Sequence, residues 1–147
     1  KVSSNRFVDS LLPLTNIDTL YKEADFIAIT CPLTPMTKKM ISFQQFSLMK
    51  DTAYIINIAR GGVIDDDALI DALNQHKIFG GALDVFTDEP LQSGHPYFNY
   101  DNLFLSPHIS GNFPEYQSDM IEQFINNLIC FLNGKTLKNR ICKKRLY

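Results

Sequence analysis

Short apolar segments recur along the chain, each bounded by turn-forming residues. They are Phe26–Thr30, Tyr54–Ile58, Gly80–Val85 and Leu103–Leu105. These segments are rich in Ile, Val, Leu and Phe and do not alternate with polar residues. That pattern is typical of strands buried on both faces of a sheet. The sequence therefore predicts four short strands in the interior of the protein.

Segments with helical spacing lie between these predicted strands, at Asn16–Glu23, Phe43–Met49 and Asp66–Gln75. In the first, Ile17, Leu20 and Tyr21 share a face; in the third, Ala68, Leu69, Ala72 and Leu73 do. Asp65 precedes the third helix in the position of an N-cap. Strands that alternate with helices indicate βαβ units with right-handed crossovers. We therefore predict an α/β fold with a doubly wound, Rossmann-like parallel sheet.

A longer helix is predicted from Pro114 to Leu132. Its apolar residues fall on one wide face, at Met120, Ile121, Phe124, Ile125, Leu128, Ile129 and Leu132. Asn112 and Pro114 supply start signals, and Asn133-Gly134 supplies a stop signal. Such a stripe has to be buried. Either the domain's own sheet covers it, or a second domain or subunit does.

The composition is that of an ordinary globular domain. The 147 residues are 45% hydrophobic and 20% charged, with a net charge of −2. This charge gives no global attraction to nucleic acid or to a membrane surface. No apolar run approaches the ~20 residues that span a bilayer, and Lys1 to Phe7 contains no signal-peptide core. We expect neither a nucleic-acid nor a membrane partner.

The cysteines and the basic residues bear on two further questions, the presence of a disulfide or metal site and the role of the C-terminal segment. Cys31, Cys130 and Cys142 are widely spaced and odd in number, which argues against a disulfide framework or zinc knuckle and fits a cytoplasmic protein. No metal site is predicted. Six of the fourteen Lys and Arg lie between residues 135 and 145, without Asp or Glu. A nucleic-acid arm is one interpretation; a solvated tail is favoured, because no stacking aromatic residues interleave with the charges.

Polar residues follow the ends of successive predicted strands, where ligands bind in an open parallel sheet. Arg60 follows the second strand, Glu89 the third and His108 the fourth. A guanidinium can bind a carboxylate through two parallel hydrogen bonds. An imidazole can protonate the alkoxide that hydride transfer creates, and a carboxylate can orient that imidazole. These are the groups needed to bind and reduce a 2-oxo acid.

The frames around these residues are more specific than the residues themselves. They are Asp25–Thr34, Met49-Lys50 with Asn57-Ile58-Ala59-Arg60-Gly61-Gly62, Gly81–Phe86 with Glu89-Pro90, and Ser106-Pro107-His108. In this order they resemble the D-isomer-specific 2-hydroxyacid dehydrogenases, from about residue 15 to the C-terminus, with Ser106 where Thr is commoner. The resemblance implies an NAD(P)-dependent oxidoreductase. Arg60 would bind the substrate, His108 would be the general acid and base, and Glu89 would orient His108. His76 and His95 are interpreted as structural.

The resemblance also implies a set of cofactor contacts. Cys31, Pro32 and Leu33 would line the adenine and ribose side. Ile58, Ala59 and Arg60 would support the nicotinamide, with His108 as a further cofactor contact, and Asp84 would contact the carboxamide. An alternative for Asp84 is a strand-end acid that bonds turn amides. Ser4 and Arg6 follow a strand expected at Lys1-Val2, and an arginine there suits the 2′-phosphate of NADP. Either NAD or NADP is expected, with a slight lean to NADP; an Arg6 without a role stays open.

The chain lacks a Gly-x-Gly-x-x-Gly fingerprint, since its glycines lie at positions 61, 62, 80, 81, 94, 111 and 134. That turn binds the cofactor pyrophosphate. We therefore expect a fragment truncated at its N-terminus. Residues 1–112 would be the C-terminal part of a dinucleotide-binding domain, and residues 113–147 a helix and tail that return to a missing substrate domain. The isolated chain should be inactive, and its parent a homodimer acting on a small 2-oxo acid.

A non-enzymatic function is the alternative. The fold also serves in transcriptional co-repressors, so the chain could be a dimerising scaffold. Joint retention of Arg60, Glu89 and His108 favours the enzyme, although the co-repressor relatives keep them too.

Overall fold

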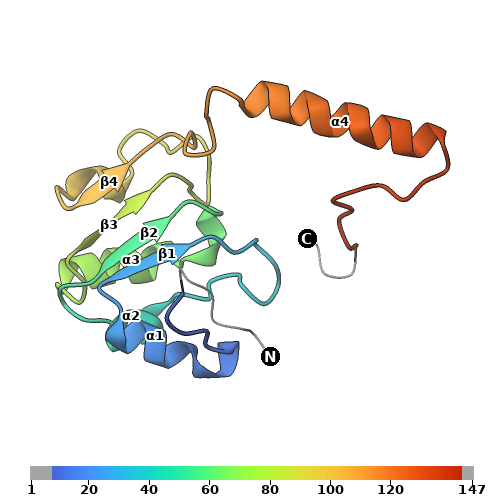
Figure 1. Cartoon of the computed structure of the whole chain (residues 1–147). Helices are drawn as coiled ribbons and strands as arrows, with labels where there is room; N and C mark the ends of the chain where they lie inside the picture. The colour runs from blue at the N-terminus through green and yellow to red at the C-terminus, as the bar shows by residue number, and fades with distance from the viewer. Residues whose placement is uncertain (1–7, 144–147) are drawn as a thin grey trace. The chain divides into compact units, whose positions relative to one another are not determined.

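The structure, a computed structural model, describes residues 8–143 (Figure 1). The strand expected at Lys1-Val2 and the candidate cofactor residues Ser4 and Arg6 lie outside the described residues. The chain divides into two compact units, Lys1–Pro107 and His108–Tyr147. The first contains the sheet and the second contains the long helix.

The first unit is built on a four-stranded sheet in the order β1-β2-β3-β4. The strands are β1 (Phe26–Ile29), β2 (Tyr54–Asn57), β3 (Gly80–Leu83) and β4 (Leu103–Leu105). All neighbouring strands pair in parallel. The predicted strands and the α/β class are confirmed. The first three strands end slightly earlier than predicted, so that Ile58 and Asp84 belong to the loops beyond them.

Helices connect the strands as predicted. The α-helices are α1 (Ile17–Glu23), α2 (Phe43–Leu48) and α3 (Asp66–Asn74), and the 3-10 helices are η1 (Leu14–Asn16), η2 (Gly61–Val63) and η3 (Pro96–Asn99). Asp65 occupies the N-cap position of α3, but its side chain makes no capping hydrogen bond. Its Oδ2 lies 3.2 Å from Lys39 Nζ and accepts a hydrogen bond from Ser42 Oγ at 3.4 Å. The predicted N-cap position of Asp65 is confirmed, and residues distant in the sequence engage its carboxylate.

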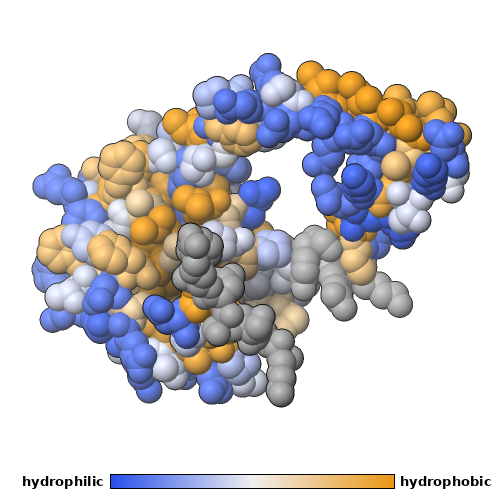
Figure 2. Space-filling model, viewed as in Figure 1, coloured by the Kyte–Doolittle hydropathy of each residue, from blue (hydrophilic) through white to orange (hydrophobic). Residues whose placement is uncertain are grey.

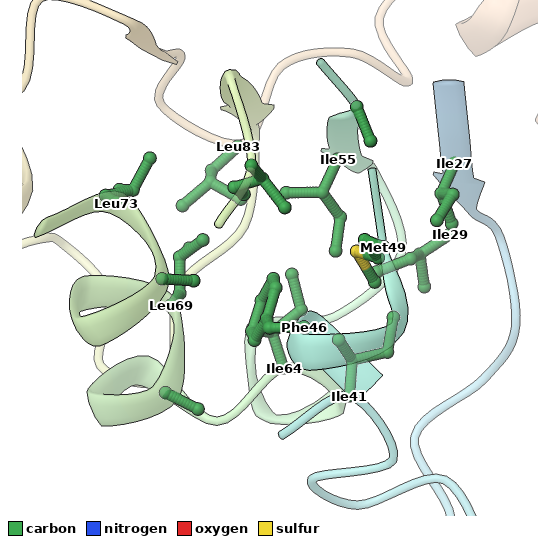
Figure 3. Packing of buried hydrophobic residues seen from close by; sticks show 14 of the residues in the cluster. Ile27, Ile29, Ile41, Phe46, Met49, Ile55, Ile64, Leu69, Leu73 and Leu83 are labelled. Atoms are coloured by element: carbon green, nitrogen blue, oxygen red, sulfur yellow. The ribbon is translucent and has the colours of Figure 1, made fainter. Parts of the chain in front are cut away.

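The core lies between one face of the sheet and the three α-helices. Each strand is added on the same side of the previous one, so right-handed crossovers place the connecting helices on a single face. Figure 3 shows Ile27, Ile29, Ile55 and Leu83 of the strands with Phe46 of α2 and Leu69 and Leu73 of α3. Tyr21 brings α1 into the same buried cluster. The predicted buried face of α3 is confirmed, whereas Leu20 of α1 is exposed.

The opposite face of the sheet is open. Its residues, Phe26, Ala28, Tyr54, Ile56, Ala82 and Phe104, are exposed or only half-buried, and we call them the open sheet face. Phe26 is 67% and Phe104 72% exposed. The Phe26 and Tyr54 rings stack with centroids 5.3 Å apart. The prediction that the strands are buried on both faces was therefore wrong for the described chain, because α1, α2 and α3 all pack on the other face.

The second unit consists mainly of α4 (Tyr116–Leu132). It begins two residues after Pro114, and its predicted apolar stripe is exposed along its length. Figure 2 shows apolar side chains in a row along this helix. Gly134, with φ of 65°, ends the helix, and the Lys135 amide donates to the Cys130 carbonyl at 2.8 Å. The Asn127 side chain then holds the tail, because its Oδ1 accepts from the Lys138 amide at 2.8 Å.

Replacing both Phe26 and Phe104 by Lys should weaken self-association of the isolated 147-residue chain. Large apolar side chains on a contiguous exposed surface promote association, and burying each contributes about 1.5–3 kcal/mol. Neither side chain belongs to the buried core, so the fold should be retained. Sedimentation velocity at micromolar concentration measures the change. Met36→Lys is the control, because Met36 is even more exposed than the two phenylalanines but lies in a loop outside the open sheet face.

Candidate active site

The carboxyl ends of the four strands meet at one edge of the sheet. Main-chain hydrogen bonds between the adjacent segments continue just beyond the ends of the strands. The Ile58 amide donates to the Ile29 carbonyl at 3.4 Å, the Asp84 amide to the Asn57 carbonyl at 3.0 Å, and the Ser106 amide to the Leu83 carbonyl at 2.9 Å. The loops that follow the strands therefore leave from adjacent points. This is the edge at which open parallel sheets bind ligands.

The loop after β2 presents Arg60 with an exposed side chain. The buried side chain of Asn57 shapes this loop. Its Oδ1 accepts from the Ala59 amide at 3.0 Å, and its Nδ2 donates to the Arg60 carbonyl at 3.0 Å. Arg60 Nη1 donates to the Ala59 carbonyl at 2.6 Å. Because a guanidinium has five N–H donors, this bond is compatible with simultaneous binding of a carboxylate.

Gly61 brings the Arg60 loop directly against the loop after β3. A Cβ atom at Gly61 would lie 1.9 Å from the carbonyl carbon of Phe86 and 2.3 Å from the Thr87 nitrogen. Only glycine fits this contact between two main chains. Glu89 lies in that second loop, and its Oε1 accepts from the Phe86 amide at 2.9 Å. The contact at Gly61 thus joins the segments that carry Arg60 and Glu89.

Asp84 is the buried acid of the edge, directly after β3, with 3% exposure. Its Oδ1 accepts a hydrogen bond from Ser106 Oγ at 2.5 Å. A buried carboxylate is stable only when hydrogen bonds replace its hydration. The carboxylate of Asp84 therefore ties the end of β3 to the residue that follows β4.

The loop after β1 packs on the Arg60 loop from the other side. The Lys39 amide donates to the Gly62 carbonyl at 2.8 Å, and the Leu33 side chain lies over Gly62, 3.4 Å from the position of an added Cβ. Within this loop, Thr37 Oγ1 donates to the Pro32 carbonyl at 2.6 Å. Pro32 and Leu33 are exposed and Cys31 is half-buried. These three residues are therefore accessible to a ligand beside the Arg60 loop.

His108 is the first residue of the second unit, separated from β4 by Ser106 and Pro107. Its side chain is exposed, and its φ is 55°. Few residues other than glycine adopt this left-handed conformation, and such backbone strain concentrates at functional sites. The structure thus brings Arg60, Asp84 and Glu89 to one edge of the first unit. His108 follows β4 along the chain and begins the second unit.

The far end of the Glu89 loop is anchored on α3. The hydroxyl of buried Tyr97 donates to Asp66 Oδ1 at 2.8 Å. Burial, and after it the nearby Asp66 carboxylate, raises the pKa of Tyr97 above its usual value of 10.0. His95 Nδ1 accepts from the Tyr97 amide at 3.3 Å, which supports a structural role for His95.

Asn57 opens the frame that contains Arg60 but was not predicted as a site residue, and neither was Tyr97. Asn57 carried an available signal, because an amide side chain at the end of an apolar strand has to find partners inside the protein. Tyr97 carried none, since Asp66, its partner, is distant in the sequence.

Comparison with known proteins identifies the family. A family model described as the D-isomer specific 2-hydroxyacid dehydrogenase, NAD binding domain, matches residues 2–110. A glyoxylate reductase of Thermofilum pendens is 42% identical over 87% of this chain, and a probable 2-ketogluconate reductase of Dictyostelium discoideum is 45% identical over 84% of it. The chain belongs to the D-isomer specific 2-hydroxyacid dehydrogenase family. It spans only 39% and 37% of the length of these two relatives.

A solved structure shares the whole fold. The chain superposes on a D-isomer specific 2-hydroxyacid dehydrogenase from Xanthobacter autotrophicus, determined in complex with NADPH, with a TM-score of 0.91 and 27% identity. The match covers 100% of this chain and 60% of that one. The Rossmann-like class is thereby confirmed.

Gly61→Ala should separate the Arg60 and Glu89 loops, because the added methyl group would overlap the main chain of Phe86 and Thr87. We expect the free energy of unfolding to fall by about 1–3 kcal/mol, as at other overpacked sites. Gly62→Ala is the matched control, since its Cβ would meet only the flexible end of Leu33 at 3.4 Å. Urea denaturation of both variants measures the difference. Equal stability of the two would show that the main-chain contact does not constrain the loops.

Tyr97→Phe should lower stability near neutral pH by about 1–3 kcal/mol, because the buried Asp66 contact is lost. The raised pKa favours the neutral hydroxyl in the fold, so this contribution is complete below pH ~10 and declines as pH rises further. The variant should therefore lose less stability than wild type between neutral and strongly alkaline pH. Tyr100→Phe, which removes a hydrogen bond to Asn74 at an exposed site, is the control. Urea denaturation across this pH range measures the free energy of unfolding of each variant. If that free energy falls in parallel with pH for wild type and Tyr97→Phe, the pH dependence does not come from the Tyr97 hydroxyl.

Proposed function

We propose that the chain forms part of an NAD(P)-dependent dehydrogenase that interconverts a 2-oxo acid and a D-2-hydroxy acid. The observation that carries this proposal is the contact at Gly61, which joins the Arg60 and Glu89 loops at the carboxyl edge of the sheet. The names of the relatives, a glyoxylate reductase and a probable 2-ketogluconate reductase, support reduction of a small 2-oxo acid.

The three candidate catalytic residues have complementary roles in this proposal. The Arg60 guanidinium binds the substrate carboxylate and polarises the neighbouring carbonyl. His108 donates a proton to the carbonyl oxygen during reduction and removes it during oxidation. Glu89 orients the His108 imidazole by a hydrogen bond to its other nitrogen. When bound, a reduced nicotinamide would supply the hydride for the carbonyl carbon.

The residues of the edge fit such a cofactor. Asp84 offers a buried acceptor for the carboxamide, and the exposed side chain of Ile58 offers an apolar surface for the nicotinamide. Ala59, Arg60 and His108 are the further candidates for the nicotinamide side, and Cys31, Pro32 and Leu33 are the candidates for the adenosine side. The NADPH in the Xanthobacter relative supports NADP, and the family description supports NAD. We keep both, with a lean to NADP.

The surfaces left uncovered support a larger parent protein. We propose that residues 1–112 complete a dinucleotide-binding domain and that residues 113–147 return to a substrate domain. The open sheet face and the stripe of α4 are apolar surfaces of the kind that such additional structure buries. No helix among the described residues is long and apolar enough to cross a membrane. The proposed parent is a cytoplasmic homodimer, and the isolated chain is inactive because it lacks the pyrophosphate-binding turn.

His108→Gln in the full-length protein should lower kcat for reduction by about 10²–10⁴-fold, the usual contribution of general acid catalysis. The dissociation constant of the cofactor should change little, because glutamine retains the size and polarity of the side chain. Steady-state reduction of glyoxylate and hydroxypyruvate with NADH and NADPH measures the effect. His76→Gln is the matched control, since His76 lies just after α3.

Two results would decide against the proposal. If the kcat of His108→Gln stays within threefold of the wild-type kcat, His108 has a structural role and not a catalytic one. A full-length wild-type protein that dimerises and binds cofactor, but reduces no 2-oxo acid, would favour the scaffold, which the exposed stripe of α4 also permits.

A further inference from the structure

Asn57 is buried at the carboxyl edge, yet the proposed reaction gives it no task. It is 1% exposed at the last position of β2. Apolar residues fill the other buried positions of β2 and β1. An amide at such a position is destabilising unless its polar atoms are bonded. The partners of the amide therefore indicate why it is there.

Both halves of the amide bond to the loop that presents Arg60. Oδ1 accepts from the Ala59 amide, and Nδ2 donates to the Arg60 carbonyl, each at 3.0 Å. Together these bonds close the chain between Asn57 and Arg60 into a small ring. The bond from the Ala59 amide is buried and the bond to the Arg60 carbonyl is partly buried. Water therefore competes less for them than for exposed bonds, and they hold the main chain more firmly.

The main chain of Asn57 is held as well. Its carbonyl accepts from the Asp84 amide at 3.0 Å. The amide side chain is thus fixed relative to the end of β3, and through it the Arg60 loop acquires a defined position at the edge. Gly61 follows at once and contacts the main chain of Phe86. Ile58 and Arg60 are the residues of this turn with exposed side chains, and Arg60 is the charged one.

Substrate binding by a guanidinium depends on where its main chain is held. Productive geometry requires groups to be placed to within a fraction of an ångström, and a misplacement of ~1 Å can reduce the rate ~10²-fold. Arg60 has a long side chain, so a loop that shifted would allow the guanidinium to bind carboxylates in unproductive positions. The Asn57 amide restricts that shift without touching the substrate itself.

We propose that Asn57 is a positioning residue, whose carboxamide fixes the main chain at Ala59 and Arg60 so that the guanidinium meets the carboxylate of the 2-oxo acid. This inference rests on the proposed function.

The test uses Asn57→Ala and Asn57→Asp in the full-length protein, with Arg60→Lys for comparison. Asn57→Ala removes both bonds. Asn57→Asp keeps the size and the acceptor for Ala59 but loses the donor to the Arg60 carbonyl. In both, kcat/KM for glyoxylate or hydroxypyruvate should fall about 10–100-fold, with a raised KM for the 2-oxo acid as in Arg60→Lys. The dissociation constant of the reduced cofactor should stay within about threefold of wild type. A raised KM for the 2-oxo acid with unchanged cofactor binding is the result expected when only the positioning of the substrate is lost.

Asn102→Ala is the matched control. The Asn102 side chain donates to the Phe79 carbonyl near the amino end of β4, away from the carboxyl edge. Its loss should lower the melting temperature and leave KM for the 2-oxo acid unchanged. If this variant shows the same rise in KM, or if kcat/KM in both Asn57 variants stays within threefold of wild type, the positioning role is wrong.

Amide hydrogen exchange tests the loop independently of activity, and it can be measured on the 147-residue chain itself. The Ala59 amide should exchange at least about tenfold faster in Asn57→Ala, because its acceptor is lost, and should remain protected in Asn57→Asp. Unchanged protection in Asn57→Ala would overturn the inference. A wild-type enzyme without 2-oxo acid reductase activity would instead overturn the proposed function, while exchange at Ala59 still reports whether Asn57 holds the loop.

Discussion

The contact of Gly61 with the main chain of Phe86 and Thr87 is the constraint on which the candidate site depends. It allows no side chain, so the loops after β2 and β3 approach as closely as two backbones can. Arg60 precedes this point in one loop and Glu89 follows it in the other. A cation and an acid from different βα units are thereby held at one edge before any ligand arrives. Such preorganisation is what the proposed reduction of a carbonyl group requires of the charges around it.

The topology of the sheet places the functional edge and the open face in the same molecule. Four parallel strands added in one direction align all carboxyl ends. The same direction sends the connecting helices to one face, which leaves Phe26 and Phe104 exposed on the other. A parallel sheet is normally covered on both faces. The arrangement that assembles the candidate site therefore also leaves an apolar surface for further structure.

Buried polar side chains mark this edge. In the described part of the chain, Asn57 and Asp84 are the buried polar or charged residues, and both lie where strands end. Asn57 bonds to the Arg60 loop and Asp84 to Ser106. A polar group in the interior is stable only when its partners are in place. The edge is therefore rigid in its backbone, while Arg60 and Glu89 extend from it with exposed side chains.

Local patterns in the sequence were sufficient for the strands, the three helices of the first unit, the α/β class and the family, and they singled out Arg60 and Glu89 as site candidates. Periodicity and motif spacing depend on neighbours along the chain, so they can be recognised in the sequence without knowledge of the fold. The tertiary structure alone decided that the described helices cover one face of the sheet and that the carboxylate of Asp65, the N-cap residue of α3, pairs with Lys39. It also decided that Gly61 touches Phe86. Each of these outcomes depends on residues far apart in sequence, whose proximity no local pattern encodes.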